Sequence, residues 1–380
     1  MPHKNLPIRP VAYTFDPVGP DALRRPELDF SSLFGEETVS KDTPLVLYPE
    51  KMGIPWQTSL PWVRQSKFWV YAEEAGRNLV TEISLGRTSE RGKLPIEMED
   101  DRRKWKIDEL VEDAISCCTY LYPTSSPIRL ALLTQSVLLL FFHDGTPFST
   151  IKLQRDHPDE ITVMDEFLTM EPKNKHLQRF SREVLDINPI LGPDLLQAIR
   201  AFVRDGRAKS PFKQSHYAHL SDYMLYRRND VGKQFMIAAI RFGGSVRHTS
   251  EELAPFDELS DLYVRHSILI NDLYSYDKEI HEAKAIDASI VNAVAVTEQL
   301  LSVPPHLAKN ITRTITWDME REFYTMCKKF MHDLSLNDRQ RIYVTALFDA
   351  LTGNIFHSAT LSRYVRHAEK PLLCMTQEGI

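Results

Sequence analysis

Glycine and cysteine are scarce in this chain of 380 residues, which contains 14 glycines and 4 cysteines. With so few glycines and few runs of alternating apolar and polar residues, the sequence disfavours a fold dominated by β-sheet. The cysteines, two of which are adjacent at Cys117 and Cys118, have the spacing of neither a metal site nor a disulfide framework. We therefore expect reduced thiols within a packed core.

An excess of positive charge and a long apolar run are also missing. The formal net charge of −6 offers no electrostatic footprint for nucleic acid. The best apolar run, Leu130–Phe142, is too short for a membrane span and contains Thr134, Gln135 and Ser136. The first residues lead into proline-rich sequence instead of an apolar signal core. These features predict a cytoplasmic protein without an integral membrane segment, either a monomer or a homodimer.

Two motifs of common enzyme classes are absent. The chain has no G-x-x-x-x-G-K-[ST] loop for nucleotide phosphates and no G-x-S-x-G elbow of a Ser-His-Asp hydrolase. Apolar residues recur instead at helical spacing, for example in 107–111, 195–199 and 323–326. Because 43% of the residues are hydrophobic, the chain can bury a substantial core. We predict an all-α bundle of ten or more helices around a central cavity.

Proline content and the lack of linkers predict how the chain is divided. The first 60 residues hold many of the 23 prolines, so residues 1–60 are predicted to form a proline-rich extended N-terminal segment. No linker divides residues 100–368. We therefore predict one α-helical domain over residues 61–368, followed by a C-terminal tail over 369–380.

The most informative motif is the segment 271–279, which reads NDLYSYDKE. At about 100° per residue, Asn271, Ser275 and Glu279 share one face of a helix. An amide, a hydroxyl and a carboxylate form a hard, oxygen-rich ligand set that suits Mg²⁺ together with a substrate phosphate. Lys278 lies beside this face and could neutralise the same phosphate. The alternative is an ordinary exposed polar face of a helix.

The full string N-D-L-x-S-x-x-K-E resembles the second metal-binding motif of class I terpene cyclases, which ionise a prenyl diphosphate and cyclise the resulting carbocation. The segment 223–232 is similar to the part of that family that carries a diphosphate sensor, a linker and an effector, which map onto Arg227, Asp230 and Val231. From the residues alone, Arg227 could instead be a surface arginine, and Asp230 its i, i+3 partner.

A third match lies near the C-terminus. Gly353 and Asn354 lead into an aromatic residue and then into Arg363-Tyr364, an order similar to the family's Gly-Asn-aromatic helix and Arg-Tyr pair. His357 departs from the family pattern, because it stands where tryptophan is common. Gly353 by itself could also be a helix packing contact. The three matches together span residues of about 140–368.

The resemblance implies a class I terpene synthase-like helical bundle around an active-site cavity, with a prenyl diphosphate as substrate and three Mg²⁺ ions bound with the diphosphate. It implies catalytic roles for Arg227, Asp230, Val231 and Tyr364. Cations and an acidic hydrogen bond would hold the diphosphate, and aromatic rings would face the carbocation. The implied substrate-binding residues are Arg227, Lys278, Arg363, Tyr364, Phe141, Trp317 and Phe356, with Phe142 as a further aromatic candidate. Each aromatic residue could equally be ordinary core.

The first metal motif departs from the family, in which it is an aspartate-rich D-D-x-x-D or D-D-x-x-E. Here only Asp144 follows the matching apolar helix, so the implied metal ligands are Asp144, Asn271, Ser275 and Glu279. Asp144 precedes glycine and could instead be a turn residue. Asp165 and Glu166, or the acidic cluster 99–101, compete for the missing role. The sequence therefore resembles a non-standard microbial sesquiterpene cyclase with a reduced first aspartate motif.

We hypothesise a lyase that ionises farnesyl diphosphate and releases diphosphate and a cyclic hydrocarbon or alcohol, with a humulene-type ring favoured by the resemblance. No D-x-D-D motif is present for protonation-initiated cyclisation. One alternative is a diterpene cyclase acting on geranylgeranyl diphosphate. Another is a non-catalytic helical protein that binds a prenyl diphosphate. A chain-elongating prenyltransferase is disfavoured, because it needs a second aspartate-rich motif.

Overall fold

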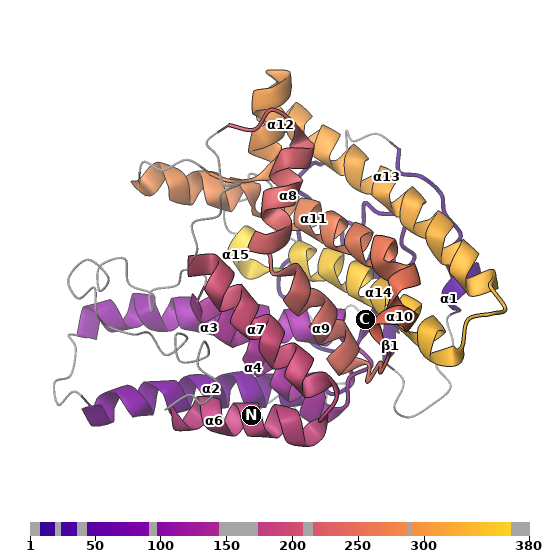
Figure 1. Cartoon of the computed structure of the whole chain (residues 1–380). Helices are drawn as coiled ribbons and strands as arrows, with labels where there is room; N and C mark the ends of the chain where they lie inside the picture. The colour runs from indigo at the N-terminus through magenta and orange to yellow at the C-terminus, as the bar shows by residue number, and fades with distance from the viewer. Residues whose placement is uncertain are drawn as a thin grey trace.

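The computed structural model describes residues 8–19, 24–35, 44–90, 97–143, 174–207, 216–286 and 290–365. Apart from one two-stranded sheet, the regular elements of these residues are helices, which confirms the predicted all-α class (Figure 1). The longer helices are α2 (Trp69–Glu90), α3 (Glu97–Leu121), α4 (Pro127–His143), α6 (Lys175–Ile187), α7 (Leu191–Arg207), α8 (Leu220–Asp230), α9 (Lys233–Gly243), α11 (Asp257–Ile286), α12 (Ala293–Leu301), α13 (Pro305–His332) and α14 (Asp338–Ala359). The short elements are α1 (Ser31–Phe34), β1 (Leu45–Leu47), η1 (Pro49–Met52), β2 (Val63–Gln65), α10 (Ser250–Leu253), η3 (Ala254–Phe256) and α15 (Ser362–Val365).

Local sequence signals set several helix starts. α4 and α13 both begin at a proline, whose fixed φ suits the first helical turn. Asn337 begins α14 with a capping box, in which its side chain accepts from the backbone N–H of Gln340 and the Gln340 side chain accepts from the backbone of Asn337. Asn292 caps α12 by accepting from the N–H of Val294 at 2.9 Å. This last cap places α12 against the candidate site.

Two groups of helices build the bundle. α2, α3 and α4 pack against one another, and α11, α13 and α14 form the second group, as Figure 1 shows. The helices α3 and α14 join the two groups at close range. A Cβ atom on Gly353 of α14 would lie 2.2 Å from the backbone oxygen of Tyr120 in α3, so only glycine permits this approach. The alternative interpretation of Gly353 as a packing contact is thus confirmed.

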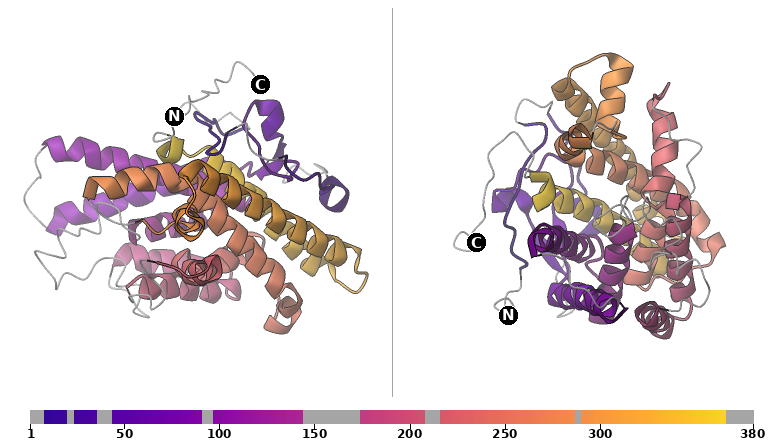
Figure 2. Two further views of the ribbon diagram at one scale, coloured as in Figure 1. Left: turned by 90° about the horizontal axis from the view of Figure 1, so that it is seen from above. Right: turned by 90° about the vertical axis from the view of Figure 1, so that its left-hand side faces the viewer.

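The N-terminal residues form a strap, which we define as residues 8–19, 24–35 and 44–66. Within it, β1 and β2 pair in an antiparallel register with Leu45 opposite Gln65 and Leu47 opposite Val63. Figure 2 shows the indigo strap along the outside of the bundle, beside the yellow helix α14. Arg64 donates to Asp349 of α14 at 2.8 Å, and the indole N–H of Trp317 in α13 donates to the carbonyl of Gln57 at 2.9 Å. The strap is therefore fastened to the bundle by buried polar contacts as well as by apolar packing.

Buried apolar residues from the strap and from both helical groups belong to one hydrophobic cluster. Phe30 and Trp62 of the strap are fully buried in it, next to Phe348 of α14. Among the described residues, no helix is long and apolar enough to cross a membrane. The strap therefore contributes to the same core as the helices.

Candidate active site

The end of α8 places three of the predicted residues at a helix break. α8 ends at Asp230, the N–H of Val231 donates back to the carbonyl of Arg227, and Gly232 adopts a left-handed conformation with φ of 73° before α9 begins. A Cβ atom at Gly232 would also meet Phe202 at 2.5 Å. Arg227 forms an ion pair with Asp230, as the i, i+3 interpretation expected. The break therefore holds Arg227, Asp230 and Val231 within one turn.

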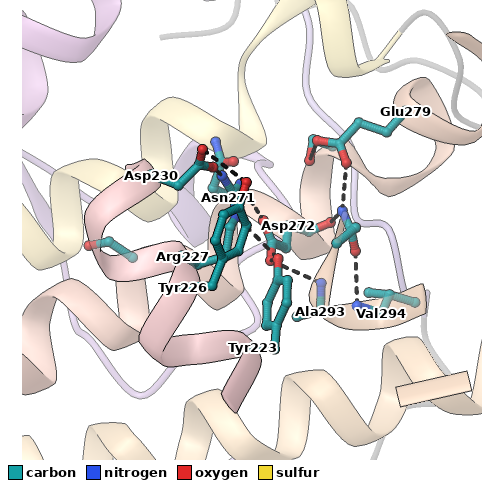
Figure 3. A network of polar contacts seen from close by, with 12 residues as sticks. Tyr223, Tyr226, Arg227, Asp230, Asn271, Asp272, Glu279, Ala293 and Val294 are labelled. Carbon is teal, nitrogen blue, oxygen red and sulfur yellow. Dashed lines mark hydrogen bonds and ion pairs between the residues drawn. The ribbon is translucent and has the colours of Figure 1, made fainter. Parts of the chain in front are cut away.

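Asp272 connects this break to α11 (Figure 3). Its side chain is fully buried and accepts from Nη2 of Arg227 at 2.8 Å, from the hydroxyl of Tyr223 and from the backbone N–H of Ala293 at 2.9 Å. The Tyr223 hydroxyl in turn accepts from Nε of Arg227 at 3.1 Å. Because a buried carboxylate needs partners for both oxygens, these donors fix the guanidinium of Arg227 in one orientation. Arg227 is thus bound to the helix that carries the candidate metal motif.

The three oxygen-bearing residues of that motif lie along α11, next to the Asp272 network. Ser275 donates to Oε1 of Glu279 at 2.6 Å, and Asn292 donates to Oε2 of Glu279 at 3.1 Å and to the carbonyl of Asp272 at 2.8 Å. The amide nitrogen of Asn271 donates to the hydroxyl of Tyr364 at 2.8 Å, so the amide oxygen is the Asn271 atom that could contact a metal ion. Figure 3 shows Asn271 and Glu279 on either side of Asp272.

The electrostatics of this face fit a bound cation. Burial raises the pKa of the Glu279 carboxyl, and the negative charge of Asp272 raises it further. Among the described residues, no group of three or more histidine, cysteine, aspartate or glutamate side chains could hold a metal ion. The donor set of Asn271, Ser275 and Glu279 contains one carboxylate and would leave most ligand positions to water and to phosphate oxygens, which is the way Mg²⁺ is commonly bound. The residues present therefore fit a divalent metal.

The C-terminal pair approaches the same face from α15. Tyr364 contacts Asn271 as described, and Nη2 of Arg363 lies 3.5 Å from the Tyr364 hydroxyl. The guanidinium of Arg363 lies 5.6 Å from the centre of the Phe141 ring, where a cation–π contact is favourable. Its Nε atom forms an ion pair with Asp113 of α3 at 2.7 Å. Lys278 of α11 forms an ion pair with Glu282 at 3.0 Å.

The aromatic candidates occupy different surroundings. Phe141 at the end of α4 lies beneath Arg363, whereas Phe356 of α14 is fully buried against Tyr120, with ring centres 4.5 Å apart. Trp317 donates its indole N–H to the strap, as described above, and is almost fully buried. Phe142 packs partly buried against the hydrophobic cluster. The structure therefore places Phe141 beside Arg363 and Trp317 against the strap.

Some predicted residues lie outside the described part of the chain. These are Asp144 and its two competitors Asp165 and Glu166. The side chains of the third acidic cluster, residues 99–101, are likewise not described. The role of a first metal motif therefore stays a prediction.

Sequence reasoning missed Asp272, Asn292 and Asp113. Asp272 is the residue after Asn271, and its signal is an ionisable side chain on the apolar side of the helix, between Ile270 and Leu273. Asn292 had the signal of a helix N-cap before the apolar run 293–296. Asp113 lies among apolar residues of α3, but nothing in the sequence links it to Arg363, which is 250 positions away along the chain.

Comparison with solved structures shows the fold class. A crystal structure of aristolochene synthase from Penicillium roqueforti is similar to this chain with a TM-score of 0.56 at 18% identity, over 79% of this chain and 97% of that one. A cucumene synthase variant is similar with a TM-score of 0.58 at 15% identity, over 79% and 98%. At this level of identity the likeness concerns the fold. The bundle is thus a class I terpene synthase fold.

Comparison with known sequences shows the family. The sequence model described as terpene synthase family 2, C-terminal metal binding, matches residues 163–322. Terpene cyclase 6 of Gibberella fujikuroi is 61% identical over 99% of this chain and 100% of its own length, and terpene cyclase aneC of Aspergillus aculeatus is 32% identical over 97% and 85%. The chain belongs to the terpene cyclase family and is a lyase. This membership decides against the non-catalytic binding protein.

Proposed function

We propose that this terpene cyclase ionises farnesyl diphosphate in the presence of Mg²⁺ and closes the carbocation to a cyclic hydrocarbon or alcohol, with a humulene-type ring as the expected skeleton. The observation that carries the proposal is the buried carboxylate of Asp272, which accepts from Arg227 at 2.8 Å and is adjacent in sequence to Asn271. A cationic residue and an oxygen-rich helix face are thus held in one rigid network. Such an arrangement suits a substrate that carries several negative charges next to a metal.

The reaction begins when the allylic carbon–oxygen bond breaks and its electron pair leaves with the diphosphate. Arg227, Lys278 and Arg363 are the cations proposed to stabilise the growing negative charge, and Tyr364 is proposed to donate a hydrogen bond to it. Asn271, Ser275 and Glu279 would hold the metal, together with Asp144. Bound Mg²⁺ would supply Lewis-acid stabilisation of the diphosphate oxygens.

The carbocation that remains needs an apolar surrounding. We assign Phe141 and Phe356 to this surrounding, because their ring faces attract positive charge. Trp317 is assigned with them on the resemblance alone, since its indole N–H is used by the strap. Asp230 and Val231 would transmit diphosphate binding at Arg227 along the helix break. The cation is finally quenched by loss of a proton or by capture of water.

The test is incubation of the purified chain with farnesyl diphosphate and MgCl₂, followed by gas chromatography and mass spectrometry of the extract. We expect a cyclic fifteen-carbon product that disappears when a chelator is added. A parallel incubation with geranylgeranyl diphosphate tests the diterpene alternative. A product from the twenty-carbon substrate alone would overturn the choice of substrate, and turnover that persists in the chelator would overturn the dependence on metal.

A further inference from the structure

Asp113 of α3 is a buried acid next to the candidate diphosphate site. Its side chain is fully buried, and its Oδ2 atom lies 2.7 Å from Nε of Arg363. Neither carboxylate oxygen accepts an aligned hydrogen bond from another described residue. A buried carboxylate without hydrogen bonds is held in its ionised form only by neighbouring charge. The ionised form of Asp113 therefore depends strongly on the positive charge of Arg363.

The charges around Asp113 come from four elements. Arg363 of α15, Lys278 of α11 and Arg9 of the strap favour its negative form, whereas Glu112 beside it on α3 opposes that form. Arg363 and Lys278 are two of the three cations that are proposed to bind the diphosphate. Asp113 therefore places a negative charge among cations that could otherwise bind an anionic ligand.

The contacts of Arg363 extend this arrangement to the metal motif. Its Nη2 atom lies 3.5 Å from the hydroxyl of Tyr364, and that hydroxyl accepts from the amide of Asn271 at 2.8 Å. The guanidinium also lies over the ring of Phe141. About a quarter of the Arg363 side chain is exposed, while Asp113 has no exposed surface. A ligand can therefore approach part of the Arg363 side chain, whereas the Asp113 carboxylate is closed to it.

We propose that Asp113 is a counter-ion that holds Arg363 in the substrate-free enzyme and competes with the diphosphate for it. This inference rests on the proposed function, because it assigns Arg363 to the diphosphate. When a diphosphate binds, its oxygens replace Asp113 as the main partner of the guanidinium. When the diphosphate product leaves, the ion pair between Asp113 and Arg363 forms again, which favours release. Asp113 is thus a positioning residue that weakens the binding of diphosphate.

A purely structural ion pair makes the opposite prediction. If Asp113 only stabilised the fold or oriented Arg363 for the ligand, its removal would weaken diphosphate binding or leave it unchanged. If Asp113 competes with the ligand, its neutralisation strengthens that binding. An opposite charge at this distance commonly changes a proton equilibrium tenfold or more, so a tenfold effect on the dissociation constant is a reasonable scale. The direction of the change in affinity separates the two explanations.

The experiment is titration calorimetry of inorganic diphosphate into the full chain in MgCl₂, which needs no turnover. We expect Asp113→Asn to bind diphosphate about tenfold more tightly than the unmodified chain. Glu112→Gln is the matched control, since it removes the neighbouring charge of α3, which pairs with Arg9 and Arg77 instead of Arg363. That control should change the dissociation constant less than twofold. Equal or weaker binding by Asp113→Asn, or equal tightening by both variants, would overturn the proposal.

Two further measurements complete the test. In an Arg363→Gln background, Asp113→Asn should no longer tighten binding, because the competition requires the guanidinium; tightening that persists there would contradict the proposal. If circular dichroism shows that Asp113→Asn does not fold, Asp113→Ser removes the same charge with a smaller group and carries the same expectation. Failure of the unmodified chain to bind diphosphate at all would refute the proposed function, and with it this inference. Binding by the unmodified chain without tightening in the variants refutes the inference alone.

Discussion

Asp272 holds three partners at one buried position, namely Arg227, Tyr223 and the start of α12. Asp272→Asn keeps the shape of the side chain but removes the charge that orients the guanidinium. A misplacement of about 1 Å at a catalytic group can lower the rate about 100-fold. We therefore expect kcat for the prenyl diphosphate to fall by about this factor in a steady-state assay, with helical circular dichroism retained.

Asp277→Asn is the matched control for Asp272. Asp277 lies on the same helix and also has a cationic partner, Lys309 of α13 at 2.6 Å, but it takes no part in the Arg227 network. We expect this variant to keep its rate within about threefold of the unmodified chain, because the loss of this charge leaves the position of Arg227 unchanged. Equal losses in both variants would show that Asp272 has no special role.

Glu279 is the only carboxylate among the described residues of the proposed metal face. Glu279→Gln removes its charge while keeping an oxygen, so we expect turnover to fall and the concentration of MgCl₂ needed for half-maximal activity to rise. Glu282→Gln, one turn later on α11 and more than half exposed, should leave both quantities nearly unchanged. A normal response of Glu279→Gln to MgCl₂ would contradict the assignment.

The raised pKa of Asp113 makes the free energy of unfolding depend on pH. Burial is the main cause that raises the pKa of Asp113 to about 6, from a usual value near 3.8. The folded state therefore binds this proton more tightly than the unfolded state, and stability falls as pH rises from about 4 to about 6. The difference between these two pKa values of Asp113 corresponds to a loss of about 3 kcal/mol in the free energy of unfolding, at about 1.36 kcal/mol per pKa unit. Asparagine does not titrate, so the Asp113→Asn variant does not lose this stability as pH rises.

The measurement is denaturant unfolding of the unmodified chain and of Asp113→Asn at several pH values between 4.5 and 7.5. Groups common to both proteins cancel in the difference between their free energies of unfolding. That difference should change in favour of the variant by about 2 kcal/mol as pH rises from 4.5 to 7.5. A difference that is constant across this range would show that Asp113 titrates normally.

At the scale of elements, the contact between α3 and α14 brings Ser116 and His357 together. His357 accepts or donates a hydrogen bond with Ser116 of α3 at 3.0 Å, depending on its tautomer, and burial lowers the pKa of His357 to about 3. The imidazole is therefore neutral at physiological pH. This close approach is possible because Gly353 has no side chain.

Gly353→Ala should therefore destabilise the bundle. The added Cβ would lie 2.2 Å from a backbone oxygen, which cannot move without shifting α3. We expect a loss of about 2–3 kcal/mol in the free energy of unfolding, as for overpacked cores. Gly76→Ala in α2 is the control, because its Cβ would meet side chains and no backbone atom, with Val111 nearest at 3.3 Å. That variant should change stability by less than about 1 kcal/mol, since alanine favours helix.

At the scale of the whole molecule, the strap and α13 share a buried ion pair. Asp16 accepts from Arg313 at 2.8 Å, and the side chain of Arg313 is almost fully buried. Asp16→Asn would leave this guanidinium without its counter-charge, which commonly costs about 3 kcal/mol or more. We expect a matching loss in the free energy of unfolding, measured by chemical denaturation. Glu27→Gln, which breaks the exposed pair with Arg24, should cost less than about 1 kcal/mol.

Much of the fold could be predicted because helical periodicity and the lack of glycine are local properties. The all-α class required only the spacing of apolar residues, and the grouping of Asn271, Ser275 and Glu279 required only the helical repeat. The assignments of Arg227, Asp230 and Arg363 depended on resemblance to a family. The strap was predicted as extended, but its β1–β2 pairing at 45–47 and 63–65 has no comparable local signal.

The sequence by itself determined the helical class and the oxygen-rich face of α11, because each depends on residues within a few turns of one another. The order of the motifs is likewise a property of the linear chain. Only the tertiary structure decided that Asp272 binds Arg227, that Asp113 faces Arg363 and that Arg313 lies against Asp16. These pairs join residues from 45 to 297 positions apart. Such contacts depend on how helices pack, and a charged side chain is buried only where packing supplies its partner.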